Sequence, residues 1–299
     1  MLERRLMIVH AHPDDEIIGT GTTMARYVEE GVAVTLVTCT LGEEGEVLVP
    51  ELAHLAAADT DALGPHRHTE LAAAMKVLGI ADWQLLGAPG KYRDSGMVET
   101  PSNAHPQAFM NADLLEAATD LVGLIRDRRP QVLVTYDEFG GYGHPDHIQA
   151  HRVTTYAAAL AQAPGFRPDL GEPWSISKFY WTAFPRSVLA EGVAALKAAG
   201  DTSGFADIDP DNTPFAIADE LVTTQVEGAD YLDRKMSALR EHATQVTTDG
   251  GFFALADGVG RQMMGTEYFR LVYSRTEPLM GESTHPADGR ETDLFAGIL

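Results

Sequence analysis

The chain has 299 residues, of which 44% are hydrophobic, and its formal net charge at neutral pH is −22. So acidic a chain argues against nucleic acid and anionic membranes as partners, because both carry negative charge themselves. No run of eighteen apolar residues occurs, so no transmembrane helix is expected. The single cysteine, Cys39, allows no internal disulfide, which predicts a buried core thiol and a cytoplasmic location.

The first half of the chain reads as alternating strands and helices. Short apolar runs predict strands, and longer segments with apolar residues three and four apart predict helices. In chain order the expected elements are a strand at 6–10, a helix at 20–30, a strand at 32–40, a helix at 69–78, a strand at 83–86, a helix at 114–128, a strand at 132–134 and a helix at 145–161. This alternation predicts an α/β protein with a mostly parallel sheet and helices on both faces.

The second half of the chain is less regular. We expect strands at 178–182 and 267–273, helices at 187–199 and 229–242, and a loop at 200–213. The polar tail at 277–290 is expected to be mobile, whereas the apolar residues at 293–299 are expected to dock on the rest of the protein.

Two short segments combine histidines and aspartates around a proline. The first, HAHPDDE at 10–16, follows the first expected strand, and the second, GGYGHPDH at 140–147, follows the strand at 132–134. Ligands of an open α/β sheet bind beyond the carboxyl ends of its strands, so both segments can reach one site. Imidazoles and carboxylates are typical ligands of a divalent transition metal, above all zinc. The pattern predicts a metal-dependent hydrolase.

Together the two segments offer six candidate ligands, whereas a catalytic zinc usually takes three from the protein. They are His12, Asp14, Asp15, His144, Asp146 and His147. The surplus suits a hydrolase, which also needs a general base and a group that stabilises an oxyanion. The structural alternative is that Asp14 or Asp15 only caps the following helix. His10 and His151 are expected to serve packing, at a strand end and on a helix face.

These segments resemble the signatures AHPDDE and HPDH of the LmbE/PIG-L family of zinc-dependent N-acetylglucosaminyl deacetylases, and both are intact here. The segments at 38–46, 93–97, 134–137, 235–245 and 291–294 are similar to the branch of that family that acts in mycothiol biosynthesis. The likeness covers nearly the whole chain and is weakest from about 164 to 230. It implies a Rossmann-like sheet with a smaller C-terminal α+β portion.

The resemblance also implies a division into a metal-binding catalytic domain at 1–165 and a C-terminal portion at 166–299 that completes the substrate pocket. Because no clear linker separates the two parts, a single domain is the alternative. His12, Asp15 and His147 would hold Zn²⁺, with Fe²⁺ as the alternative because the same ligands suit both ions.

The remaining motif residues would carry the chemistry. Asp14 would be the general base, and His144, oriented by Asp146, would stabilise the oxyanion. Tyr142, in a mobile glycine loop, would contact the substrate carbonyl or the intermediate. Four further residues would line the sugar or inositol pocket: Arg67, Asp94, Met97 and Glu46.

The implied reaction is hydrolysis of the acetamide on a GlcNAc-inositol pseudo-disaccharide, which gives acetate and a free amine. A small amino-sugar inositol would be the partner, with no nucleic acid, membrane or obligate protein partner. One alternative is another GlcNAc deacetylase of the same family. A second is the sister amidase of mycothiol S-conjugates, which carries a lysine shortly after the first motif, where this chain has none through Glu30.

Two alternatives lie outside the family. A dinucleotide-binding oxidoreductase needs a G-x-G-x-x-G loop after its first strand, but here Gly19 and Gly21 come late and Met24 occupies the third glycine position. A non-catalytic sugar-binding module would tolerate the loss of a general base, yet Asp14 and every candidate ligand are present.

Overall fold

The computed structural model describes residues 3–200, 204–247, 261–276 and 289–298. Within these residues, seven strands form one sheet in the order β3-β2-β1-β4-β5-β7-β6. The strands are β1 (Arg5–His10), β2 (Ala33–Thr38), β3 (Asp82–Leu85), β4 (Val132–Thr135), β5 (Lys178–Ala183), β6 (Thr224–Glu227) and β7 (Thr266–Ser274). The five strands from β3 to β5 are parallel, and β7 is antiparallel to both β5 and β6. The expected α/β fold with a mostly parallel sheet is confirmed.

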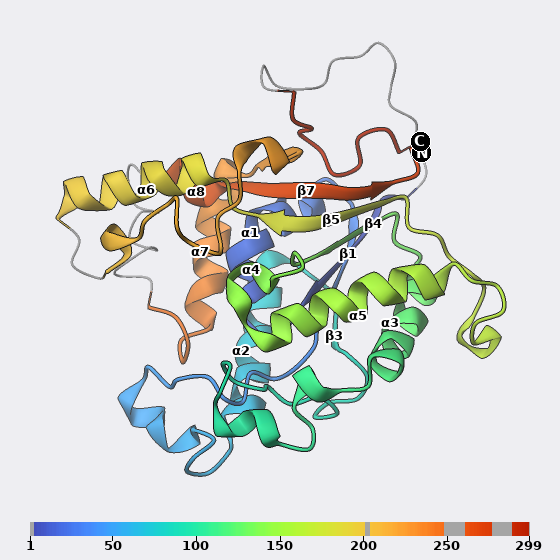
Figure 1. Ribbon diagram of the computed structural model, residues 1–299, viewed down its shortest axis with the longest axis horizontal. Coiled ribbons are helices and arrows are strands. Elements are labelled where there is room, and N and C mark those ends of the chain that lie inside the picture. Colours follow the sequence, from blue (N-terminus) through green and yellow to red (C-terminus); the bar gives the residue numbers. More distant parts are fainter. Residues whose placement is uncertain (1–2, 201–203, 248–260, 277–288, 299) are drawn as a thin grey trace.

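Helices cover both faces of this sheet. One face packs on α1 (Asp15–Glu29), α2 (Leu63–Leu78) and α7 (Leu232–Glu241), and the other on α3 (Leu114–Arg128) and α5 (Pro145–Ala161). Side chains alternate along β1, so Leu6 and Ile8 join the first cluster whereas Met7 and Val9 join the second. All four are fully buried. In Figure 1, α6 (Arg186–Ala199) lies at the left, away from α3 and α5 at the lower right.

Two helix starts and one strand differ from the sequence expectation, and α8 (Arg261–Gly265) is a short helix that it did not include. Helix α1 begins at Asp15 and not near residue 20, because the polar motif residues that start it hide its apolar periodicity. Helix α2 begins at Leu63 and not at 69, which places Arg67 on this helix. Strand β6 was not expected, since its four residues, TQVE, are too short and polar to stand out.

The C-terminal half otherwise follows the expectation closely. The helix expected at 229–242 is a 3₁₀ turn at Ala229–Tyr231 followed by α7, and the part of the expected loop that the structure describes, 204–213, includes a 3₁₀ turn at Phe205–Asp207. Leu294 and Phe295 are buried, so the expected docking is confirmed over 293–298. Residues 201–203, 277–288 and 299 lie outside the described residues.

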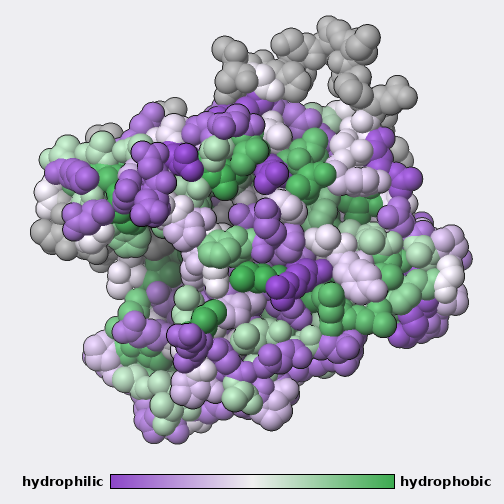
Figure 2. All heavy atoms as spheres, in the orientation of Figure 1, coloured by the Kyte–Doolittle hydropathy of each residue, from purple (hydrophilic) through white to green (hydrophobic). Residues whose placement is uncertain are grey.

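Strands from both sides of residue 165 belong to the same sheet, and the division into a catalytic domain and a C-terminal portion stays a prediction. Figure 2 shows hydrophilic and hydrophobic residues intermixed over the face in view. Within the described ranges, no helix has both the length and the apolar composition that crossing a membrane requires.

Candidate metal centre and active site

The two histidine-rich segments meet because β1 and β4 are neighbours. These strands run parallel, with Leu6 opposite Val132 and Ile8 opposite Val134, so their carboxyl ends lie at the same edge of the sheet. The strand order also reverses here, since β2 flanks β1 on one side and β4 flanks it on the other. This is the position at which doubly wound sheets bind ligands. The expected convergence of the two segments is confirmed.

Three acceptor atoms form a nearly equilateral triangle at this edge. Nδ1 of His12, Nε2 of His147 and Oδ2 of Asp15 lie 3.3 Å from one another. His12 lies in the turn between β1 and α1, Asp15 is the first residue of α1, and His147 is in the first turn of α5. A metal bound at 2.0–2.1 Å in a tetrahedral site has ligands about 3.3 to 3.4 Å apart. The spacing therefore fits a metal ion of the size of zinc.

Neighbouring groups fix which ring nitrogen of each histidine faces the triangle. Nε2 of His12 lies 3.2 Å from the carboxylate of Asp146, and Nδ1 of His147 lies 3.1 Å from the carbonyl oxygen of Gly140. Each of these nitrogens donates its proton to that acceptor, which leaves the lone pair of the other nitrogen in the triangle. Such outer contacts are the usual way in which metal-binding histidines are oriented.

The electrostatics of the cluster also favour a cation. Burial opposes protonation of His12, but the carboxylates of Asp94, Asp146 and Asp15 outweigh it and raise its pKa well above the usual value. Burial acts against ionisation of Asp15 as well, yet His147 and His12 hold the pKa of its carboxyl far below the usual range. A site that attracts a proton this strongly also attracts a metal ion, with which the proton competes.

Asp14 is held beside the triangle in an unusual backbone conformation. It occupies the N-cap position of α1 with φ 109°, a conformation that costs a residue other than glycine on the order of 1–3 kcal/mol. Its carboxylate caps no backbone N–H of the helix, so the capping alternative is wrong for this residue. Instead, Oδ2 of Asp14 accepts a hydrogen bond of 3.0 Å from Arg67. Burial raises the pKa of Asp14 to about 6, although Arg67 opposes the shift.

His144 lies against both histidines of the triangle, with its ring centroid 4.6 Å from that of His12 and 5.1 Å from that of His147. Its Nδ1 accepts the backbone N–H of Asp146 at 3.1 Å, so the neutral ring carries its proton on Nε2 and is a donor there. Burial, with His12 and His147 nearby, lowers the pKa of His144 to about 3. The side chain of Asp146, expected to orient His144, instead contacts His12 and Ser95, so only the backbone of Asp146 orients His144.

Tyr142 lies over the same cluster. Its ring meets the ring of His147 edge to face, with centroids 5.0 Å apart, and 48% of its surface is exposed. The expected glycine loop is a single helical turn, α4 (Gly140–Gly143), in which Gly141 has φ 74°. The carboxylate of Asp137 accepts the N–H groups of Phe139 and Gly141 and holds this turn.

The four expected pocket residues have different surroundings. Arg67 is 3% exposed and donates to the carbonyl oxygens of Gly42 and Pro13 as well as to Asp14. Asp94 is buried beside His12 and accepts the N–H of Gly96. By contrast, Met97 is 47% exposed, and Glu46 is also exposed. Contact of these four residues with a substrate stays a prediction.

Two residues at the site were assigned no role from the sequence. Tyr136 donates its hydroxyl to Oδ2 of Asp15 at 2.8 Å, accepts the N–H of Ala11 at 2.9 Å and stacks on His147. Tyr136 directly follows β4, at the edge of the sheet where ligands bind, and it lies within the segment 134–137 that the resemblance had marked. Ser95 donates its N–H and its hydroxyl to Asp146 and lies within the segment 93–97, which the resemblance had already marked.

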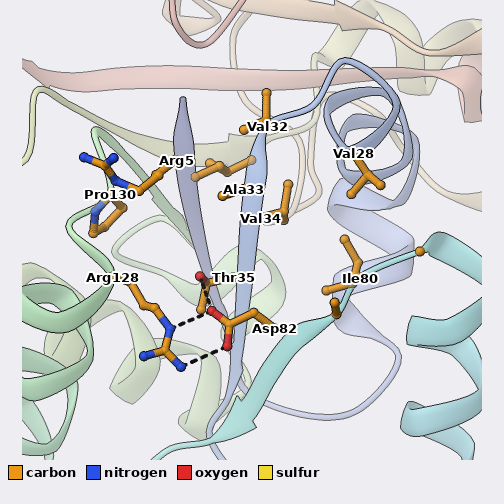
Figure 3. Close-up of a pocket in the computed structure, with 13 residues that line it drawn as sticks. Arg5, Val28, Val32, Ala33, Val34, Thr35, Ile80, Asp82, Arg128 and Pro130 are labelled. Atoms are coloured by element: carbon orange, nitrogen blue, oxygen red, sulfur yellow. Dashed lines mark hydrogen bonds and ion pairs between the residues drawn. The ribbon is translucent and has the colours of Figure 1, made fainter. Parts of the chain in front are cut away.

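A cavity elsewhere in the fold is separate from this cluster. It has a volume of about 260 Å³ and is lined by the amino-terminal ends of β1, β2 and β3, at the opposite edge of the sheet (Figure 3). The charged groups in it are already paired, since Arg128 contacts Asp82 at 2.7 Å and Asp82 also accepts from Thr35.

Comparison of the sequence with known proteins finds deacetylases of one family. Residues 7–158 match the PIG-L family, described as GlcNAc-PI de-N-acetylase. Over 296 residues the chain is 58% identical to the 1D-myo-inositol 2-acetamido-2-deoxy-alpha-D-glucopyranoside deacetylase of Geodermatophilus obscurus, covering 99% of this chain and 98% of that protein. The protein of the same name from Kribbella flavida is 54% identical over 305 residues, again covering 99% and 98%.

Solved structures share the fold at lower identity. An N,N'-diacetylchitobiose deacetylase from Pyrococcus horikoshii matches with a TM-score of 0.61 and 20% identity, covering 90% of this chain and 84% of that one. The 4-carboxy-2-hydroxymuconate hydratase GalB from Pseudomonas putida matches with a TM-score of 0.59 and 20% identity, covering 93% and 100%. Since a hydratase and a deacetylase share this fold, the fold alone does not define the reaction. The family match over half of the chain and the relatives above 50% identity show that this chain belongs to the PIG-L family.

Proposed function

We propose that this chain is a metal-dependent hydrolase that removes the N-acetyl group of 1D-myo-inositol 2-acetamido-2-deoxy-alpha-D-glucopyranoside in mycothiol biosynthesis. The products are acetate and the free glucosaminyl-inositol. The observation that carries the hydrolase chemistry is the triangle of His12, Asp15 and His147 beside the partly buried Asp14 carboxylate. The substrate is supported by relatives with that name, which are 54–58% identical over 99% of this chain.

The donor set supports Zn²⁺ as the ion, with Fe²⁺ as the alternative, because two imidazoles and one carboxylate suit both. The ion, when bound, lowers the pKa of water to about 7 and polarises the amide carbonyl. The chain's own residues do the rest. Asp14, ionised above a pKa of about 6, accepts a proton from the attacking water and returns it to the amide nitrogen as the C–N bond breaks. Nε2–H of His144 donates to the oxyanion that develops on the carbonyl.

The proposal extends to the surroundings of the reaction. Tyr142, which lies over His147, contacts the carbonyl or the tetrahedral intermediate, and Arg67, Asp94, Met97 and Glu46 line the sugar or inositol side of the pocket. A small amino-sugar inositol is the only partner that the proposal requires. A cytoplasmic location is supported by the single cysteine, Cys39, which is buried and allows no internal disulfide.

Acetate release from GlcNAc-inositol by the purified protein tests the proposal. The wild type should release acetate in a metal-dependent manner, whereas Asp14→Ala should keep its metal and lose most of its turnover. Parallel kinetics on a mycothiol bimane conjugate separate the deacetylase from the amidase. A higher kcat/KM for the conjugate would reverse the choice between the two.

A further inference from the structure

Glu16 and His242 form a buried pair directly behind Asp14. Oε1 of Glu16 lies 3.0 Å from Nε2 of His242, and both side chains are completely buried. Glu16 is the last residue of the first motif, and no part of the proposed chemistry uses it. His242 directly follows α7, 226 residues further along the chain. A buried carboxylate needs such partners, because burial without them is unfavourable.

The second oxygen of Glu16 reaches the backbone of the general base. Oε2 accepts the N–H of Asp14 at 2.9 Å. On the other side of the same peptide group, Arg67 donates to the carbonyl oxygen of Pro13. The Pro13–Asp14 peptide is therefore held at both of its polar atoms by buried side chains, which fixes Asp14 at its φ of 109°.

Because of this arrangement, the Asp14 side chain does not act as the N-cap of α1. An aspartate at an N-cap normally accepts an N–H of the first helical turn, and a glutamate at the third helical position normally reaches back to the N-cap N–H. Here Glu16, at the second helical position, makes the backward contact, but Asp14 makes no capping bond. The Asp14 carboxylate is therefore not used to cap the helix, and it accepts a hydrogen bond from Arg67 instead.

The segment that carries His242 is held in place by hydrogen bonds to α2. The N–H and the hydroxyl of Thr244, two residues after His242, donate to the carboxylate of Glu70 at 2.9 and 2.7 Å. Glu70 lies on α2, the helix that also carries Arg67. The segment at 242–244 thus ties α7 to the helix that holds Asp14 from the other side.

We propose that Glu16 and His242 are positioning residues for Asp14: His242 fixes the Glu16 carboxylate, and Glu16 fixes the backbone of the general base. The inference rests on the proposed deacetylase function. If it holds, loss of the pair moves Asp14 without removing any metal ligand. Turnover then falls while substrate affinity and metal content stay as they were, because displacement of a catalytic group by about 1 Å can cost about 100-fold in rate.

The kinetic test compares Glu16→Ala and Glu16→Gln with the wild type. Glu16→Ala should lower kcat by about 100-fold and change KM by less than about threefold. Glu16→Gln keeps an amide oxygen for the Asp14 N–H, so it should regain most of the lost kcat. His242→Gln, whose amide can still donate to Glu16, should lose less activity than His242→Ala.

A matched control is Glu291→Ala. Glu291 is a largely buried carboxylate that accepts from Lys178, Tyr180 and Thr224, far from the metal centre. This variant should lose stability and keep its kcat. If Glu16→Ala loses no more kcat than Glu291→Ala, or if Glu16→Gln fails to restore turnover, the pair is only structural and the inference is wrong.

Amide hydrogen exchange tests the pair without substrate. The Asp14 N–H should exchange faster in Glu16→Ala than in the wild type and Glu16→Gln, and unchanged exchange in Glu16→Ala would overturn the inference. A wild type that releases no acetate from GlcNAc-inositol would refute the proposed function instead, and the exchange result would still decide the role of Glu16.

Discussion

Nε2 of His12 lies 3.2 Å from Oδ2 of Asp146, so a carboxylate of the second motif orients a metal-facing histidine of the first. Ser95 donates its N–H and hydroxyl to the same carboxylate and holds it in place. The contact leaves Nδ1 of His12 in the triangle with Asp15 and His147. The two motifs are thus joined through the outer contact as well as through the ligands.

Replacing Asp146 by asparagine should weaken metal binding. Both carboxylate oxygens of Asp146 accept hydrogen bonds, Oδ2 from His12 and the Ser95 N–H and Oδ1 from the Ser95 hydroxyl, whereas asparagine has only one side-chain oxygen. Loss of such an outer contact typically costs 10- to 100-fold in metal affinity. Competition with a chelator measures the affinity. Asp120→Asn, at a carboxylate that pairs with Lys91 away from the cluster, is the control. Equal affinities of the Asp146 variant and the wild type would show that the contact does not orient His12.

Gly140→Ala should displace His147. Gly140 has φ 67°, and a Cβ there would lie 2.6 Å from Cβ of His147 and 2.8 Å from the backbone nitrogen of Ile148. Since the carbonyl oxygen of Gly140 also accepts from Nδ1 of His147, the ligand moves with the strained backbone. We expect weaker metal binding and lower kcat. Gly165→Ala, where a Cβ meets open space, is the control and should behave as the wild type.

Tyr136→Phe should destabilise the protein. The change leaves the N–H of Ala11 without its side-chain acceptor and Asp15 without a hydroxyl donor. An unsatisfied buried polar group costs about 1–3 kcal/mol. Urea unfolding of the metal-free protein should show a decrease of this size in the free energy of unfolding. A variant as stable as the wild type would mean that these hydrogen bonds contribute little.

The activity should depend on pH through Asp14. A general base works only when ionised, so kcat/KM should fall about tenfold per pH unit below the pKa of Asp14, which burial raises to about 6. A bound cation favours the ionised carboxylate, so the acidic limb of the pH profile of kcat/KM should have its midpoint at or below pH 6. Arg67→Met removes a positive charge that lowers this pKa and should shift the limb to higher pH. If the midpoint of the acidic limb is the same in Arg67→Met and in the wild type, a group other than Asp14 titrates there.

The strands and the meeting of the two motifs could be predicted because they follow from local pattern and one topological rule. Apolar runs in the sequence predict β1 and β4. Because the carboxyl ends of neighbouring parallel strands lie at the same edge of a sheet, the motifs that follow these strands meet there. The start of α1 could not be predicted, since Asp14, Asp15 and Glu16 are polar and belong to the site. Their helical role depends on backbone contacts that the sequence pattern does not show.

Contacts between distant residues were beyond the sequence for a different reason. Asp146 is two residues from His144, and proximity suggested that pair, but the first turn of α5 points its carboxylate towards His12 and Ser95 instead. Glu16 and His242 meet only because α7 packs on α1 and α2, and no periodicity encodes which polar ends of packed helices will touch. Pairings of this kind depend on tertiary packing.

The central claim is that one metal ion, held by His12, Asp15 and His147, supports deacetylation. Its most direct test is the rate of acetate release from GlcNAc-inositol as Zn²⁺ is added back to metal-stripped protein. We predict no measurable rate without metal and saturation at one equivalent per chain, with no recovery in His147→Ala. Full activity of the stripped protein, or equal recovery in His147→Ala, would contradict the claim.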